Sequence, residues 1–118
     1  MNREVKYSLD VSLRLEIVKV KNAILTNLHG SKIFLFGSIA KGCYSKYSDI
    51  DLLVLIDSYK SKRELRQVRH EIEDSIEDLN ISKEVDIKLY TTARYNEICI
   101  EPSFEKSILE DFIDIGGW

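Results

Sequence analysis

Two aspartates, Asp49 and Asp51, stand one residue apart at the start of the hydrophobic run IDLLVLI at residues 50–56. Side chains alternate between the two faces of a strand, so both carboxylates are expected to point the same way. Two like charges this close repel each other, and burying either of them is costly. A shared proton or a neighbouring Arg or Lys would relieve the repulsion. So would a divalent cation such as Mg²⁺, which prefers carboxylate oxygens as ligands.

A third acid, Asp86, lies between Val85 and Ile87 in the alternating segment EVDIKLY at residues 84–90. If this segment is a strand beside residues 50–56, three carboxylates converge on one spot. Three carboxylates can hold two metal ions about 3.5–4 Å apart, an arrangement used for phosphoryl and nucleotidyl transfer. The third acid therefore favours the metal ion over the shared proton or the neighbouring cation.

The turn that precedes the paired aspartates has residues suited to binding phosphate. Gly37 allows the backbone to approach an anion closely, and a helical turn beginning at Ser38 would direct free N–H groups at it. Lys41 follows one turn later and adds positive charge. Ser48, directly before the aspartates, is expected either to contact a phosphate or to cap a turn.

The spacing of these residues resembles the signature of a known family. Gly37-Ser38, ten further residues and then Asp49-Ile50-Asp51 match the pattern GSx10DxD. This is the signature of the minimal nucleotidyltransferases, the smallest members of the DNA polymerase β-like superfamily. The stretches FGSIAKG and SDIDLLV resemble the core motif of that family almost letter for letter. VDIKL is similar to the later strand that carries its third acid.

The resemblance implies an Mg²⁺-dependent enzyme that transfers AMP from ATP to an acceptor hydroxyl and releases pyrophosphate. In the family, the Gly-Ser turn binds the triphosphate and the paired acids bind Mg²⁺. The third acid completes the metal site, in which two ions are expected, and helps to activate the attacking hydroxyl. Carried over to this chain, phosphate binding falls on Gly37 and Ser38, and metal binding and catalysis fall on Asp49, Asp51 and Asp86.

The resemblance also implies a protein partner. Small stand-alone members of the family resemble the antitoxin of paired systems whose toxin is an all-helical HEPN ribonuclease, and in that group AMP is attached to a tyrosine of the toxin. Two alternatives stay open. The chain could be a non-catalytic module that neutralises its partner by docking alone. It could also be the catalytic subunit of an antibiotic-modifying nucleotidyltransferase, which would need a partner subunit to shape the acceptor pocket.

The rest of the sequence predicts a small β-sheet flanked by helices, an α/β fold, and the resemblance implies that the sheet is mixed and of the polymerase β-like nucleotidyltransferase type. Apolar residues at helical spacing predict a helix over residues 9–28 and another from about 62 to 79. Ser61 and Glu64 fit a capping box at the start of the second helix. The expected stripes are Leu9, Leu13, Ile17, Val20, Ile24 and Leu28 on the first helix, and Leu65, Val68, Ile72, Ile76 and Leu79 on the second.

Three strands are expected between and after these helices, at residues 32–36, 50–56 and 84–90. The second strand is apolar on both faces apart from Asp51, which predicts a central place in the sheet. Thr92 is expected to cap a short helix over residues 93–98. A last helix is expected from Phe104, Ile108, Phe112 and Ile115, with Gly116 as its end. The predicted order is α-β-α-β-α-β-α.

The composition is that of one compact domain over residues 1–118, and 44% of its residues are hydrophobic, enough for a core. No apolar run approaches the roughly 20 residues of a membrane span, so no membrane partner is expected. Cys43 and Cys99 form no CxxC pair, which predicts a reduced, cytoplasmic location. The net charge of −3 argues against strong nucleic-acid binding.

Overall fold

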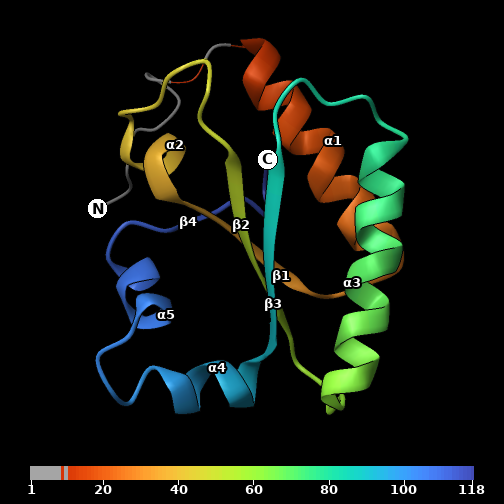
Figure 1. Cartoon of the computed structure of the whole chain (residues 1–118), viewed down its shortest axis with the longest axis vertical. Helices are drawn as coiled ribbons and strands as arrows, with labels where there is room; N and C mark the ends of the chain where they lie inside the picture. The colour runs from red at the N-terminus through yellow and green to blue at the C-terminus, as the bar shows by residue number, and fades with distance from the viewer. Residues whose placement is uncertain (1–8, 10) are drawn as a thin grey trace.

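The computed structural model describes residue 9 and residues 11–118. A four-stranded sheet in the order β3-β2-β1-β4 forms its centre (Figure 1). β1 runs antiparallel to β2 and β4, whereas β2 and β3 are parallel, so the sheet is mixed, as predicted. The elements are α1 (Val11–Asn27), β1 (Lys32–Phe36), α2 (Gly37–Lys41), β2 (Ile50–Ile56), α3 (Lys62–Glu77), β3 (Val85–Thr91), α4 (Thr92–Ile98), α5 (Phe104–Ser107), the 3₁₀ turn η2 (Ile108–Glu110) and β4 (Ile113–Asp114).

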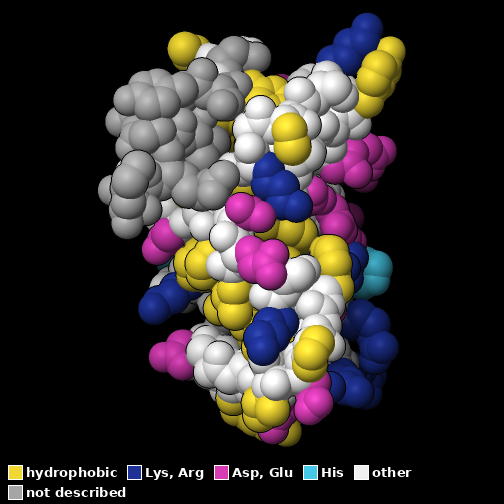
Figure 2. All heavy atoms as spheres, turned by 90° about the vertical axis from the view of Figure 1, so that its left-hand side faces the viewer, with side chains coloured by type: hydrophobic (Ala, Val, Ile, Leu, Met, Phe, Trp, Pro, Cys, Tyr) yellow, Lys and Arg dark blue, Asp and Glu magenta, His cyan; other side chains and the backbone are white. Residues whose placement is uncertain are grey.

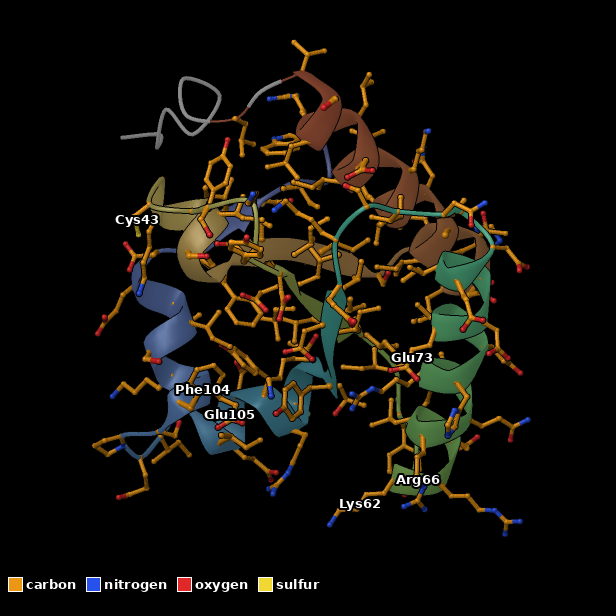
Figure 3. The ribbon with its side chains drawn as sticks, turned by 45° about the horizontal axis from the view of Figure 1, so that its top comes forward. Cys43, Lys62, Arg66, Glu73, Phe104 and Glu105 are labelled. Atoms are coloured by element: carbon orange, nitrogen blue, oxygen red, sulfur yellow. The ribbon has the colours of Figure 1, made fainter. Side chains whose placement is uncertain are left out.

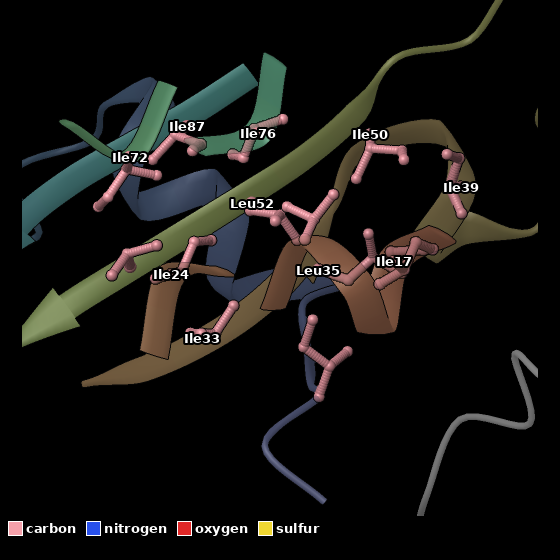
Figure 4. Packing of buried hydrophobic residues seen from close by; sticks show 14 of the residues in the cluster. Ile17, Ile24, Ile33, Leu35, Ile39, Ile50, Leu52, Ile72, Ile76 and Ile87 are labelled. Carbon is pink, nitrogen blue, oxygen red and sulfur yellow. The ribbon is translucent and has the colours of Figure 1, made fainter. Parts of the chain in front are cut away.

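The two long helices, α1 and α3, pack on one face of the sheet and form the larger hydrophobic core with it (Figure 4). All six residues of the first predicted stripe are buried, from Leu9 to Leu28. On the second stripe, Ile72 and Ile76 are buried and the other three residues pack partly buried against the same core. The strands contribute Ile33, Leu35, Ile50, Leu52, Val54, Ile56 and Ile87 to this core.

Within residues 9 and 11–118, no helix has the length and apolar character needed to cross a membrane.

A smaller core lies on the other face of the sheet, where α4 and α5 are found. Its buried side chains are Phe36, Leu53, Tyr95 and Ile108. Alternation along β1 and β2 explains the division, because neighbouring residues of a strand point to opposite faces. Asp51 is two residues before Leu53, so its carboxylate lies on the α4 and α5 face.

The connection from β2 to β3 passes through α3, as a parallel pair of strands requires. α3 begins with the predicted capping box: the Ser61 side chain accepts from the Glu64 N–H, and the Glu64 side chain accepts from the Ser61 N–H. β2 lies between β1 and β3, which confirms its predicted central place.

Two predictions near the C-terminal end are wrong. The N-cap of α4 is Thr91, not Thr92: the Thr91 hydroxyl accepts from the Arg94 N–H at 3.2 Å, and the helix begins at Thr92. The Thr92 hydroxyl instead donates to the Ile56 carbonyl at the end of the neighbouring strand β2, at 3.5 Å. The cap therefore lies one residue earlier than the sequence suggested.

The predicted last helix stops after Ser107, and the chain continues through η2 into the edge strand β4. Ile108 packs in the smaller core with Phe36, whereas Ile115 is fully buried in the larger core on the other face. One straight helix cannot place these two side chains on opposite faces of the sheet, so the chain has to pass around the edge of the sheet. It does so beside β1, where the Ile115 N–H donates to the Ile33 carbonyl at 3.1 Å.

Candidate active site

The turn after β1 brings the backbone against a carboxylate. Gly37 has φ of 79°, a left-handed conformation that side chains other than glycine's rarely adopt. A Cβ atom at this position would overlap Asp51 Oδ2 and would lie 3.1 Å from Asp51 Cγ. Phe36, the residue before Gly37, is the register partner of Asp51. The Gly37 position is therefore restricted to glycine both by its backbone conformation and by the adjacent carboxylate.

Asp51 and Asp86 are side by side on the same face of the sheet, because they are register partners in the parallel pair of β2 and β3. The pKa of Asp51 is raised from 3.8 to about 6. Burial is the largest cause, followed by the negative charges of Asp86 and Asp49, and Lys88 opposes them. The half-buried Asp51 thus lies where a cation would be favourable.

Asp49 precedes β2 and is exposed. It is near enough to raise the pKa of Asp51, although it does not line the cavity beside Asp51. In the described part of the chain, no group of three or more His, Cys, Asp or Glu side chains is arranged to hold a metal ion. Of the three acids expected to converge, the structure therefore places Asp51 and Asp86 together and Asp49 at their margin.

A cavity of about 230 Å³ lies over this pair of acids, between α2, the sheet and the α5 region. Lys41 and Lys88 bring positive charge to its walls, and Phe104 and Ser107 close it from α5. The described part of the face toward α2, α4 and α5 carries acidic, basic and hydrophobic side chains mixed together (Figure 2). A small cavity with both charge signs and an aromatic wall suits part of a nucleotide.

The α5 wall of the cavity is tied to β3 and to α4 by two tyrosines. The Tyr90 hydroxyl on β3 donates to the Glu105 carboxylate at 2.9 Å, and the Tyr95 hydroxyl on α4 donates to the Glu105 carbonyl at 2.5 Å. Burial raises the pKa of Tyr90 to about 12, so this hydroxyl stays protonated and remains a donor. Glu105 and its neighbour Phe104 are thereby held beside the sheet (Figure 3).

The remaining predicted site residues lie in α2 and the following loop. Ser38 is half-buried in α2, a helix of five residues, and Lys41 at its end lines the cavity. With so short a helix, backbone N–H groups and Lys41 would contribute more to phosphate binding than a helix dipole. The Ser48 hydroxyl accepts from the Ser45 N–H at 2.9 Å, which favours its alternative role as the cap of a turn.

Sequence reasoning missed six of the residues that line the cavity, among them Lys88, Phe104 and Asp111. Lys88 could have been found, because it follows Asp86 by two residues in a strand and must share its face. Its ammonium lies 5.4 Å from the ring centre of Phe104. Asp111 could not be found in this way, because the sequence predicted one continuous last helix through this residue. In the structure Asp111 follows the 3₁₀ turn η2 instead.

Comparison with known proteins decides the family. Residues 17–115 match the model of the nucleotidyltransferase domain, which covers the strands, the Gly37 turn and all three acids. The chain belongs to the nucleotidyltransferase domain family. This nucleotidyltransferase is 31% identical over 104 residues to a Methanocaldococcus jannaschii protein with the provisional name protein adenylyltransferase. The match covers 86% of this chain and 99% of that protein.

Two solved structures have the same fold as this nucleotidyltransferase. One, from Sulfolobus solfataricus, carries the provisional name nucleotidyltransferase and has a TM-score of 0.56 and 17% identity, with 97% of this chain and 87% of that chain covered. The other is a toxin–antitoxin crystal structure with AMP-PNP, with a TM-score of 0.52 and 18% identity. That match covers 86% of this chain and 73% of the other. Both confirm the predicted fold.

Proposed function

We propose that this nucleotidyltransferase transfers AMP from ATP to a hydroxyl group of a protein partner, in a reaction that depends on Mg²⁺. One observation carries the proposal. Asp51 and Asp86 lie side by side against the Gly37 turn, in a cavity that Lys41 and Lys88 also line. Acids that face a glycine turn and nearby lysines fit a site for a metal ion together with a phosphate chain.

The acids fit Mg²⁺ by their chemistry. The donor set of Asp49, Asp51 and Asp86 consists of carboxylate oxygens, and the pKa of Asp51 is raised first by burial and then by the negative charges of Asp86 and Asp49. We assign these three residues to the metal site and expect two ions. When bound, Mg²⁺ would neutralise the negative charge that the phosphates carry during transfer.

The phosphates are assigned to the turn. Backbone N–H groups at Gly37 and Ser38 can donate to phosphate oxygens, because they are the first residues of α2 and the first N–H groups of a helix have no partner within it. Lys41 supplies a charge-assisted hydrogen bond from the wall of the cavity. Ser48 contributes indirectly, through the turn that it caps within the loop.

The reaction forms a bond between the acceptor oxygen and the α-phosphorus and breaks the bond to the β-phosphate oxygen, so pyrophosphate leaves. The acceptor hydroxyl loses a proton in this step. Asp86 is the candidate to orient the hydroxyl and accept that proton, because its carboxylate lies on the cavity wall beside Asp51.

A protein acceptor is supported by three observations. The cavity of about 230 Å³ is smaller than the 300–1,000 Å³ or so typical of small-molecule sites, so it has little room for an acceptor beside a nucleotide. The M. jannaschii relative is named for transfer to protein, and one structural neighbour is a toxin–antitoxin complex. The specific form that we propose is an antitoxin, located in the cytoplasm, that modifies a tyrosine of a HEPN-type toxin.

The test is to incubate the chain with ATP, Mg²⁺ and the protein encoded by the neighbouring gene, and to measure that protein by mass spectrometry. We expect the mass of one or more AMP groups to be added, and none with EDTA or with Asp86→Asn. Asp57→Asn is the matched control, because Asp57 is an exposed acid just after β2. A partner that stays unmodified, yet is neutralised equally by wild type and Asp86→Asn, would support docking alone and contradict the proposal.

A further inference from the structure

A side chain from a distant part of the sequence contacts the loop between α2 and β2 at three points. The Lys83 ammonium donates to three backbone carbonyls of the loop, those of Ser45, Lys46 and Ser48, each at 3.1 Å. An ammonium group has three N–H donors, so all of them are used on this loop. Hydrogen bonds from a charged donor are about twice as strong as neutral ones. One cation therefore ties the backbone of this loop to the segment before β3.

The loop itself is folded so that its carbonyls can meet that cation. The Ser45 N–H donates to the Ser48 hydroxyl at 2.9 Å, the Tyr47 N–H donates to the Ser45 hydroxyl at 3.1 Å, and the Ser48 N–H donates to the Ser45 carbonyl at 3.1 Å. These contacts direct carbonyl oxygens toward a common point. Without a cation there, the oxygens would repel one another, and the turn would be expected to open.

Lys83 is in turn held from both sides. Its neighbour Ser82 donates through its N–H and its hydroxyl to the two carboxylate oxygens of Glu16 on α1, at 3.0 and 2.8 Å. On the other side, the Glu84 carbonyl accepts from the Ile50 N–H at 2.9 Å, at the start of β2. The backbone that carries Lys83 is thus fixed to α1 and to β2, within reach of the loop carbonyls to which its ammonium donates.

Ser48 is the last residue of the loop whose carbonyl accepts from Lys83, and Asp49 follows it directly. The Asp49 carboxylate is exposed, so packing does little to fix its direction. Its position depends on the backbone at Ser48 on one side and on β2 on the other. We propose that Lys83 is a positioning residue, which fixes this loop and thereby holds Asp49 at the margin of the metal site. The expected effect on metal binding rests on the proposed function, whereas the hydrogen bonds from Lys83 to the loop do not.

Three variants test the inference. Lys83→Met removes the ammonium and keeps an unbranched side chain, and Lys83→Arg keeps a cation with several donors. Lys62→Met removes an exposed lysine at the start of α3, far from the loop that begins near Cys43 (Figure 3). Purified apo proteins are compared by hydrogen exchange of individual amides, and ATP binding is measured by calorimetry over a series of Mg²⁺ concentrations.

In Lys83→Met we expect the Tyr47 and Ser48 amides to exchange about tenfold faster or more, because charge-assisted hydrogen bonds that hold their loop are lost. The Mg²⁺ concentration that half-saturates ATP binding should rise about 10- to 100-fold, as when a group that orients a metal ligand is removed. Lys83→Arg should recover part of both effects, and Lys62→Met should show neither.

Two results would overturn the inference. If the loop amides exchange at the same rate in Lys83→Met and Lys62→Met, Lys83 does not hold the loop, whatever the chain binds. If the loop opens but the Mg²⁺ dependence is unchanged, Lys83 is a structural residue without a role in positioning Asp49. Failure of the proposed function is a separate result, in which the wild-type chain binds ATP equally with and without Mg²⁺.

Discussion

Replacing Asp51 by Asn tests whether this carboxylate destabilises the fold that contains it. Its pKa is raised from 3.8 to about 6, because burial and then Asp86 and Asp49 disfavour the ionised form. Between these two values the folded chain binds more protons than the unfolded chain, so the free energy of unfolding falls as the pH rises. Above a pH of about 6, both states are ionised and the loss is complete.

The size of the effect follows from the shift. Two pKa units correspond to about 3 kcal/mol if the whole shift is expressed in stability. Asp51 is only half-buried, and screening by solvent reduces this to about 1–2 kcal/mol. Asn has the same shape without the charge. Asp51→Asn should therefore raise the free energy of unfolding of the apo protein by about 1–2 kcal/mol at pH 8, and by roughly half as much at pH 5.

The assay is urea unfolding in EDTA at several pH values from 5 to 8, with Asp57→Asn as the control for removing one exposed acid near β2. A gain for Asp51→Asn that grows with pH agrees with the reasoning. The reasoning is refuted if Asp51→Asn is less stable than wild type at pH 8, or if the difference is the same at all pH values. Either result would mean that the carboxylate is satisfied within the apo fold.

Two further predictions concern the turn and the core. Gly37→Ala and Gly30→Ala both place a side chain at a left-handed φ, at a cost of about 1–2 kcal/mol in unfolding free energy. Gly37→Ala should also displace Asp51 and abolish Mg²⁺-dependent ATP binding in calorimetry, whereas Gly30→Ala, whose Cβ meets no atom within 4 Å, should keep it. Ile72→Ala should lower the unfolding free energy in urea by about 2–5 kcal/mol, because it leaves a cavity in the larger core. The exposed Leu15→Ala should change it little, and equal losses would contradict the assignment of the core.

Local signals made the first two strands and the capping box predictable. β1 and β2 have the predicted bounds because each run of apolar residues is closed by residues that interrupt a strand, such as Gly37. The capping box needed only Ser61 and Glu64, three residues apart. Asp86 was expected to join Asp51 if their two strands are neighbours, and the register of the parallel pair agrees with this expectation. Their roles in catalysis stay predictions.

The features that the sequence did not reveal depend on contacts between distant segments. The spacing of Phe104, Ile108 and Phe112 suits a helix, yet Phe112 stacks on Phe34 of β1 with the ring centres 4.5 Å apart. β4 has two residues, too few for any periodicity, and is defined by its pairing with β1. The contacts of Lys83 with the loop likewise join residues 35 to 38 positions apart, which no local pattern encodes.

The parallel pairing of β2 and β3 has a consequence for the order of events during synthesis. A nascent chain that has left the ribosome up to the end of β2 already contains Gly37, Asp49 and Asp51, but the neighbour of Asp51 is still missing. Asp86 is made only after α3, and it reaches Asp51 only when β3 pairs with the edge of β2 that faces away from β1. This non-local pairing is slow compared with forming a helix or a hairpin. Asp51 and Asp86 therefore meet only when β3 has paired with β2 and the connection through α3 is complete. An incomplete or partly unfolded chain would lack the candidate site, so any activity of that site would appear together with a finished fold.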